Sequence, residues 1–285
     1  MVAIAALPIS REEILKAAES LPTGPRVLAQ LEELLTDPSA DLDAVAEVLR
    51  PDTGITTRVL RISNSPIFSR GSPASSIEEA IARLGLGEVR RLAAVAAMAA
   101  ISEGSLRWYG VSGVALRENS LLTALIAEQL AGPAQIDSRS AYTAGLLRST
   151  GKIVLERAAT RLKRGLETVD RAENSLLDWE RQSFGSTNTA ACADVLKSWR
   201  FPADIFIPIR DHYLSSLSVE PLMMAVLLNL AASSAEKAGH SILGETSYWL
   251  EPENAYGKLG MAIGDVEAGV RVALEKFARM RAFLQ

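Results

Sequence analysis

The sequence is poor in the residues on which many functional sites depend. Its 285 residues include one cysteine and two histidines, and aromatic residues make up 5%. A single cysteine excludes an internal disulfide framework and suits a reducing compartment. Cys192 lies among alanines, so we expect a packed structural thiol rather than a reactive one. His212 and His240 have no partner at metal-binding helical spacing, and each is expected at the surface or at a helix cap.

The chain also lacks an excess of basic residues and any long apolar run. Lys and Arg number 30 against 34 Asp and Glu, a net charge of −4, which argues against a broad nucleic-acid-binding face but not against a small basic patch. The most apolar windows, 92–101 and 222–232, are shorter than the roughly 20 residues that span a bilayer. The start, MVAIAALPISREE, has no basic leader. We therefore expect a cytoplasmic protein without a nucleic-acid or membrane partner.

What is present is helical periodicity, in a normal globular balance of 48% apolar and 22% charged residues. In DLDAVAEVLRPD the apolar residues share one helix face, with Asp41 as the N-cap and Pro51 as a stop. Ser76 and Glu79 have the spacing of a capping box at the start of another helix. No convincing strand alternation and no internal repeat occur, so the pattern predicts an all-α protein.

Helical patterns continue to the end of the chain, with the clearest at 115–132, 140–158, 187–200, 220–239 and 264–284. The looser stretch 102–114, SEGSLRWYGVSGV, separates two helical parts. We expect an N-terminal part at 15–110 and a second part with a C-terminal helix at 111–285. This leaves no room for a receiver, kinase or cyclase domain, which we expect on separate chains.

The stretch GLLRSTGKIVLERA, at 145–158, poses the main question, because a polar block interrupts residues suited to a buried helix. A phosphate-binding P-loop needs four residues between its glycines, then Lys and Ser or Thr. Here five residues separate Gly145 from Gly151, Ile153 follows Lys152, and no strand precedes. The pattern is therefore a near-miss, not a P-loop.

A DNA-reading helix-turn-helix at 77–98 is a second alternative. Its second helix offers Arg90 and Arg91 and then becomes almost wholly apolar, whereas a reading helix must present polar groups to base edges. We expect a packed helix here. The sequence also assembles no Ser-His-Asp or Cys-His set, so no catalytic residue is assigned.

The chain resembles the HDOD family, helical signalling modules related to HD-domain phosphohydrolases. The resemblance is carried by nearly continuous segments from Leu21 to Ala93, including DPSADLDAVAEVL, RVLRISNS and SSIEEAIARLGL. It continues more weakly through ENSLLTALIAEQLA, AYTAGLLRSTGKIVLE, FGSTNTAACADVLKSWRFPADIFIPIRDHY and LLNLAASSAEKA. The resemblance implies an HD-domain-like helical bundle with an N-terminal helical subdomain.

The resemblance also implies that the metal site is lost. HD-domain enzymes hold metal through a His, a His-Asp pair, further His residues and a late Asp. In this sequence those positions carry, in order, Asn119, Arg148-Ser149, Asn188 and Ala232, with His212 as a remaining relic. One His cannot build a hydrolytic metal centre. We expect no metal, no cofactor and no catalysis.

Two interpretations of the polar block remain open. An Arg cannot ligate a cation, so RSTGK resembles a disused metal-site turn. Arg148 could pair with a nearby carboxylate that stabilises the old site. Alternatively Arg148, Lys152 and Asn119 could bind an anion such as a nucleotide phosphate without cleaving it.

The resemblance implies a non-catalytic signal-transduction protein that acts through protein–protein interaction. Its partners would be a sensor kinase, a response regulator of a two-component system, or a cyclic-dinucleotide enzyme, each on a separate chain. The alternatives are a nucleotide sensor without turnover and a metal-dependent phosphohydrolase using other carboxylates. The loop 64–75 is a candidate contact surface, because turn-rich loops often carry contacts.

Overall fold

The structure, a computed structural model, describes residues 8–35, 37, 40–66, 68, 73–164, 175–214 and 220–281. Its helices are α1 (Arg11–Glu19), α2 (Gly24–Leu34), α3 (Leu42–Leu49), α4 (Thr53–Ser63), α5 (Ile77–Leu84), α6 (Leu86–Ile101), α7 (Gly113–Ala131), α8 (Ser138–Leu147), α9 (Thr150–Arg161), α10 (Leu176–Phe184), α11 (Asn188–Ser198), α12 (Ala203–Asp211), α13 (Met223–Lys237), α14 (Pro252–Leu259) and α15 (Ile263–Met280), with a short 3-10 helix η2 (Thr246–Tyr248). The one β pairing among these residues is an isolated antiparallel bridge between Leu106 and Val111. The prediction of an all-α fold is confirmed.

Local capping sets several helix starts as the sequence predicts. The Asp41 carboxylate accepts the backbone N–H of Ala44 at 2.8 Å and begins α3. The Ser76 hydroxyl accepts the Glu79 N–H at the start of α5. The Glu79 carboxylate, however, accepts the N–H of Ser75 and not that of Ser76, so the reciprocal half of the predicted capping box is shifted by one residue.

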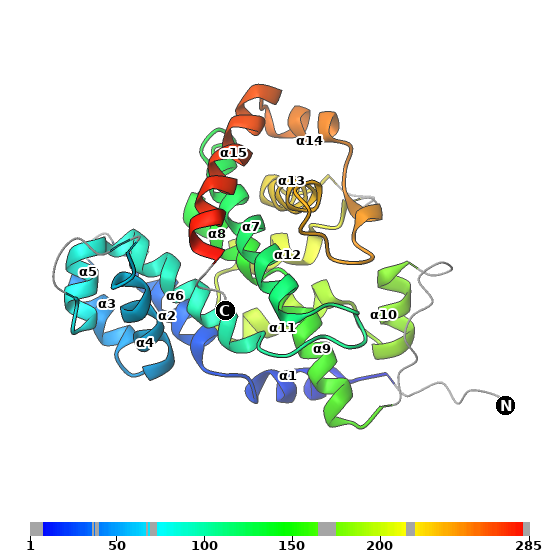
Figure 1. The fold of residues 1–285 in the computed structure, drawn as a ribbon. Coiled ribbons are helices and arrows are strands. Elements are labelled where there is room, and N and C mark those ends of the chain that lie inside the picture. The colour runs from blue at the N-terminus through cyan, green and yellow to red at the C-terminus, as the bar shows by residue number, and fades with distance from the viewer. Residues whose placement is uncertain are drawn as a thin grey trace.

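The helices form two groups that meet along α6 and α8 (Figure 1). In the first group, α2 to α5 surround the alanine-rich α6, whose small side chains allow close packing. In the second, α7 is central and packs against α8, α13 and α15, while α9 packs against α11. The first helix, α1, drawn in blue in Figure 1, packs against α9 and α11. The division of the chain at residue 110 remains a prediction.

Two arginines of α6 make polar contacts that link the two groups. Arg90 of α6 is 3% exposed and donates to the Glu32 carboxylate at 2.8 Å and to the Thr143 hydroxyl of α8 at 3.1 Å. Arg91 pairs with Glu88 and with Glu128 of α7, both at 2.7 Å. Both arginines of the helix-turn-helix candidate therefore serve packing, as expected for α6.

Candidate functional site

The polar block of the stretch 145–158 is a tight turn between two buried helices. Helical periodicity runs over 140–158, but α8 ends at Leu147 and α9 begins at Thr150, so Arg148 and Ser149 form a turn, as the interpretation of RSTGK as a disused metal-site turn predicts. The block is nevertheless buried, since Arg148 is 1% exposed and Lys152 is 0% exposed. The helix is interrupted at Ser149, whose φ of −94° and ψ of 2° depart from helical geometry, and the long side chains of Arg148 and Lys152 both point into the core.

Arg148 is held on three sides by side chains from distant parts of the chain. Its Nη2 donates to the Oδ1 of Asn119 at 2.6 Å and lies 2.9 Å from the Oε2 of Glu245, an ion pair outside hydrogen-bond geometry. Its Nη1 lies 3.5 Å from the Nε2 of His212. The interpretation in which Arg148 pairs with a carboxylate therefore has its partner, Glu245.

Lys152, one turn further along α9, faces the same carboxylate. Its Nζ donates to the Oε1 of Glu245 at 2.6 Å, to the hydroxyl of Tyr213 at 2.9 Å and to the Oδ1 of Asn188 at 3.1 Å. The Tyr213 hydroxyl in turn donates to the same Glu245 oxygen at 2.7 Å. All three donors of the ammonium group are thus satisfied within the core.

A second carboxylate lies behind Lys152. Glu180 of α10 is 0% exposed and accepts the backbone N–H of Asn188 at 2.7 Å and its amide at 3.0 Å. Its other oxygen accepts the Tyr109 hydroxyl at 2.8 Å. Burial raises the pKa of Glu180, and the charge of Lys152 opposes that rise. We call Asn119, Arg148, Lys152, Glu180, Asn188, His212, Tyr213 and Glu245 the buried polar cluster.

Electrostatics fix the protonation states inside this cluster. Burial alone would raise the pKa of Glu245, but the attraction of Arg148 and Lys152 outweighs it and holds that pKa well below the ordinary value. Burial and the charge of Arg148 lower the pKa of His212 to about 3. His212 is therefore neutral, with the proton on Nδ1, which lies 2.7 Å from the carbonyl oxygen of Ile209.

The structure brings most of the predicted residues together. Asn119, Arg148, Lys152, Asn188 and His212 join the cluster. Ser149 lies in the turn beside it, and its buried hydroxyl has no hydrogen-bond partner among the residues that the structure describes. His212 is the C-cap residue of α12, one of the two positions expected for it, and its side chain is fully buried rather than at the surface.

Other predicted positions lie beside the cluster. Ala232 is buried on α13 and carries no polar side-chain atom, whereas Asn229, one turn earlier, donates to the carbonyl oxygens of His212 and Tyr248 at 2.8 Å. His240 contributes through its backbone, because its carbonyl accepts the amide of Asn119 at 2.5 Å. Its ring lies 3.4 Å from the carboxylate of Glu118.

Sequence reasoning missed Glu245, Glu180 and Tyr213. Glu245 follows Gly244, whose φ of +90° turns the backbone after α13, and it lies in a segment without helical periodicity. Nothing in its local sequence indicates a buried acid. The one available signal is chemical: two cations placed in an apolar region require a carboxylate from elsewhere.

These residues do not fit a divalent metal ion. An Arg and a Lys point into the cluster, and both pair with its carboxylate Glu245, so a cation placed there would meet two positive charges. Among the residues that the structure describes, no group of three His, Cys, Asp or Glu side chains is arranged to hold a metal. The cluster is suited to holding helices together.

The HDOD domain family matches residues 21–215, so the chain belongs to that family, as the resemblance predicted. An HDOD domain protein of unknown function from Geobacter sulfurreducens is 23% identical, with a TM-score of 0.66, covering 96% of this chain and 98% of that one. A proposed phosphohydrolase from Shewanella amazonensis is 22% identical, with a TM-score of 0.60 and coverage of 95% and 96%.

A proposed signal transduction protein from Marinobacter aquaeolei is 19% identical, with a TM-score of 0.69, covering 96% of this chain and 65% of that one. At these identities the likenesses establish the fold. A search of curated proteins finds no match. Within the described residues, no helix has the length and apolar character needed to cross a bilayer.

Proposed function

We propose that this HDOD protein is a non-catalytic, cytoplasmic signal-transduction module that acts through protein–protein interaction. Its partners are signalling proteins on separate chains: a sensor kinase, a response regulator or a cyclic-dinucleotide enzyme. Membership of the HDOD family supports the signalling role. The fold supplies helical surfaces on which such partners can dock.

One observation carries the non-catalytic part of this proposal. The positions that the resemblance assigns to metal ligands are filled by Asn119, Arg148 and Asn188, and Arg148 is neutralised by Glu245 at 2.9 Å. A hydrolytic metal centre needs a negatively charged or neutral ligand set with an open position for water. The guanidinium group of Arg148 is positively charged, so it cannot be a metal ligand, and it is fully buried, so it leaves no open position for water.

The same contacts weigh against the cluster as a nucleotide sensor. Arg148 and Lys152 are 1% and 0% exposed, and both already contact Glu245. A nucleotide phosphate entering there would have to displace that carboxylate and open the core. The signalling module without turnover is therefore the function that the geometry supports best.

The loop proposed as a contact surface lies partly outside the described residues. Its ends are joined, because the amide of Asn64 donates to the carbonyl of Ala74 at 2.9 Å and accepts the Ala74 N–H at 2.7 Å. The Asn64–Ala74 contact holds the end of α4 near the start of α5, so a change to the loop should keep these two residues. The loop remains our candidate for a partner contact.

A hydrolysis assay tests the absence of catalysis. The natively purified protein is analysed for Mn, Fe, Zn and Mg and incubated with cyclic dinucleotides and bis(p-nitrophenyl) phosphate. We expect substoichiometric metal and no turnover, with or without added metal. Stoichiometric metal together with hydrolysis would establish the phosphohydrolase alternative.

Affinity capture tests the interaction. The tagged chain is used to recover partners from its native cell lysate, and a chain in which residues 65–73 are replaced by a Gly-Ser connector, with Asn64 and Ala74 kept, serves as the matched control. We expect reproducible recovery of a sensor kinase, a response regulator or a cyclic-dinucleotide enzyme, reduced with the replaced loop. Recovery of none of these classes above background would contradict the proposal.

A further inference from the structure

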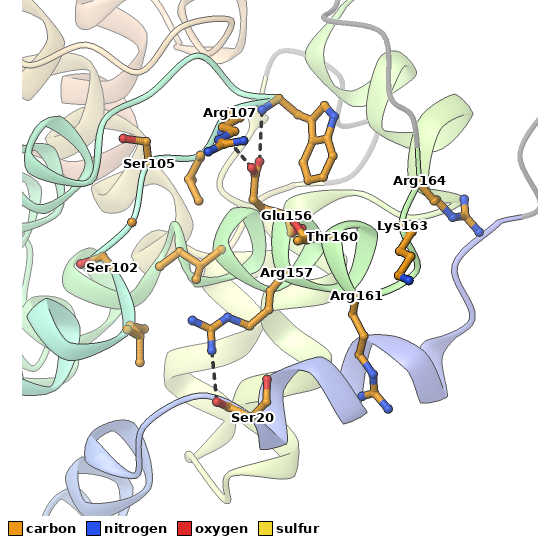
Figure 2. A pocket seen from close by; sticks show the side chains of 15 residues that line it. Ser20, Ser102, Ser105, Arg107, Glu156, Arg157, Thr160, Arg161, Lys163 and Arg164 are labelled. Atoms are coloured by element: carbon orange, nitrogen blue, oxygen red, sulfur yellow. Dashed lines mark hydrogen bonds between the residues drawn. The ribbon is translucent and has the colours of Figure 1, made fainter.

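A large basic cleft is lined by one face of α9 and by the segments around it (Figure 2). It has a volume of about 890 Å³, within the range of small-molecule sites, and it is bounded by the end of α1, the loop 102–108 and the face of α9 that carries Ile153, Arg157 and Arg161. None of the residues that line it belongs to the buried polar cluster, so the cleft is a separate site.

The lining of the cleft is strongly positive in a chain whose net charge is −4. Its cationic residues are Arg107, Arg157, Arg161, Lys163 and Arg164. Within the described part of the chain none of the five forms an ion pair. Figure 2 shows Arg157 pointing toward Ser20, whose carbonyl oxygen it contacts at 3.1 Å, and Arg161 extending from the same face of α9.

The single carboxylate in the lining is already occupied. Glu156 is 8% exposed and accepts the backbone N–H groups of Arg107 at 2.8 Å and Trp108 at 3.2 Å. Glu156 thereby fixes the loop 102–108 onto α9 and forms the wall of the cleft. Arg157 and Arg164 donate to the carbonyl oxygens of Ser20 and Ser183, which are neutral acceptors, so the positive charges of the rim remain available to an external anion.

The chemistry of the lining selects a class of ligand. Guanidinium groups bind phosphate oxygens in bidentate geometry, and Arg157 and Arg161 are one helical turn apart on α9. Trp108, half-buried in the lining, offers an aromatic ring on which a base can stack. We propose that this cleft binds a nucleotide, with its phosphates on Arg107, Arg157 and Arg161 and its base against Trp108.

Calorimetric titration of the full chain tests the proposal with GTP, ATP and tripolyphosphate as probes. At about 50 mM KCl, where exposed charges are weakly screened, we expect binding of a nucleotide, and weakening at higher salt. Arg107→Gln with Arg161→Gln should weaken it at least about tenfold. Neither side chain makes a hydrogen bond to another described residue that this change would break.

Two further variants separate the parts of the site. Trp108→Leu should weaken nucleotide binding while leaving tripolyphosphate binding unchanged, because it removes stacking and no charge. Arg271→Gln, an exposed position on α15 far along the chain from the cleft, is the matched control and should bind as the wild type does. Thermal unfolding of each variant confirms that it is folded.

The following results would overturn the proposal. The wild type could bind no nucleotide up to millimolar concentration, or the double variant could bind as tightly as the wild type. A polyglutamate decapeptide that binds more tightly than either nucleotide, and depends on Arg107 and Arg161, would make the cleft a docking site for an acidic protein segment. Each result is independent of whether the buried polar cluster is catalytic.

Discussion

Lys152 and Glu245 lie 93 residues apart in the sequence, and their side chains meet in the core at 2.6 Å between Nζ and Oε1. The contact joins the first turn of α9 to the segment after α13, and Arg148 approaches the other oxygen of the same carboxylate. Two cations on adjacent turns therefore depend on one acid from a distant segment. This dependence decides what substitutions in the cluster should do.

Replacing Glu245 with Gln should destabilise the fold by about 3–5 kcal/mol, because Arg148 and Lys152 would remain buried beside each other without that carboxylate. Urea unfolding followed by circular dichroism measures the change. Glu267→Gln, at an exposed position on α15, is the matched control and should shift the free energy of unfolding by less than about 0.5 kcal/mol.

A double-mutant cycle with Lys152→Met sharpens this prediction. Once Glu245 is Gln, removing the Lys152 charge should cost less than it does in the wild type, giving a coupling energy of about 1–3 kcal/mol. Additive effects of the two changes would show that the contact contributes nothing specific to stability.

The buried His212 should make stability depend on pH. Its pKa is about 3 in the folded protein against 6.5 ordinarily, so below pH 6.5 the unfolded chain binds a proton that the folded chain does not. Stability should therefore fall as the pH falls. Between about pH 7.5 and pH 5 this one group should remove about 2 kcal/mol.

His212→Asn isolates that contribution. The amide can replace the donor to the Ile209 carbonyl but does not titrate, so the variant should show a flatter fall in stability over the same pH range. Urea unfolding at several pH values compares the two proteins. Equal slopes for both would show that the pKa of His212 is the same in the folded protein as in the unfolded chain.

The sequence predicts the helices and their caps more completely than it predicts the residues of the buried polar cluster. Capping chemistry is local, so the Asp41 cap of α3 could be read directly from the chain. The resemblance assigned Asn119 and Arg148 to one former metal site. In the structure the Nη2 of Arg148 lies 2.6 Å from the Oδ1 of Asn119. Each of these predictions depends on residues within a recognisable segment.

The contacts that the sequence does not predict join residues that are far apart in the chain. Glu245 lies in an irregular segment, so no periodicity marks it as buried, and its role exists only once α9 and α13 are packed. The turn at Arg148 and Ser149 was expected from the polar block. The acid that pairs with Arg148 could not be identified, because Glu245 is remote from Arg148 in the sequence.

Cys192 should be unreactive in the folded protein, as expected from its alanine-rich surroundings. It is fully buried, its thiol donates to the Leu147 carbonyl at 3.3 Å, and burial raises its pKa to about 12. Ellman's reagent should detect no thiol in buffer and one per chain in guanidinium chloride. Rapid labelling of the native protein would show that α11 opens to solvent.

Gly151 explains why the polar block contains a glycine. A Cβ there would lie 1.8 Å from the backbone oxygen of Asn188 and 2.8 Å from the backbone nitrogen of Cys192, so α9 and α11 could not remain in contact. Gly151→Ala should therefore destabilise the protein by about 3 kcal/mol or more, beyond ordinary overpacking because backbone atoms must move. Movement of the α11 backbone would also displace the Oδ1 of Asn188 from the Nζ of Lys152, which lies 3.1 Å away in the wild type.

Gly257→Ala should have the opposite effect on stability from Gly151→Ala. Gly257 lies inside α14, and among the described residues no neighbouring atom comes within 4 Å of the position that an alanine Cβ would take. Alanine should therefore stabilise the helix by about 0.5–1 kcal/mol. Urea unfolding of both variants separates close packing from helix propensity. If Gly151→Ala also proved neutral or stabilising, the backbones of α9 and α11 would have to lie further apart than in the structure. The buried polar cluster between these helices would then be less tightly packed as well.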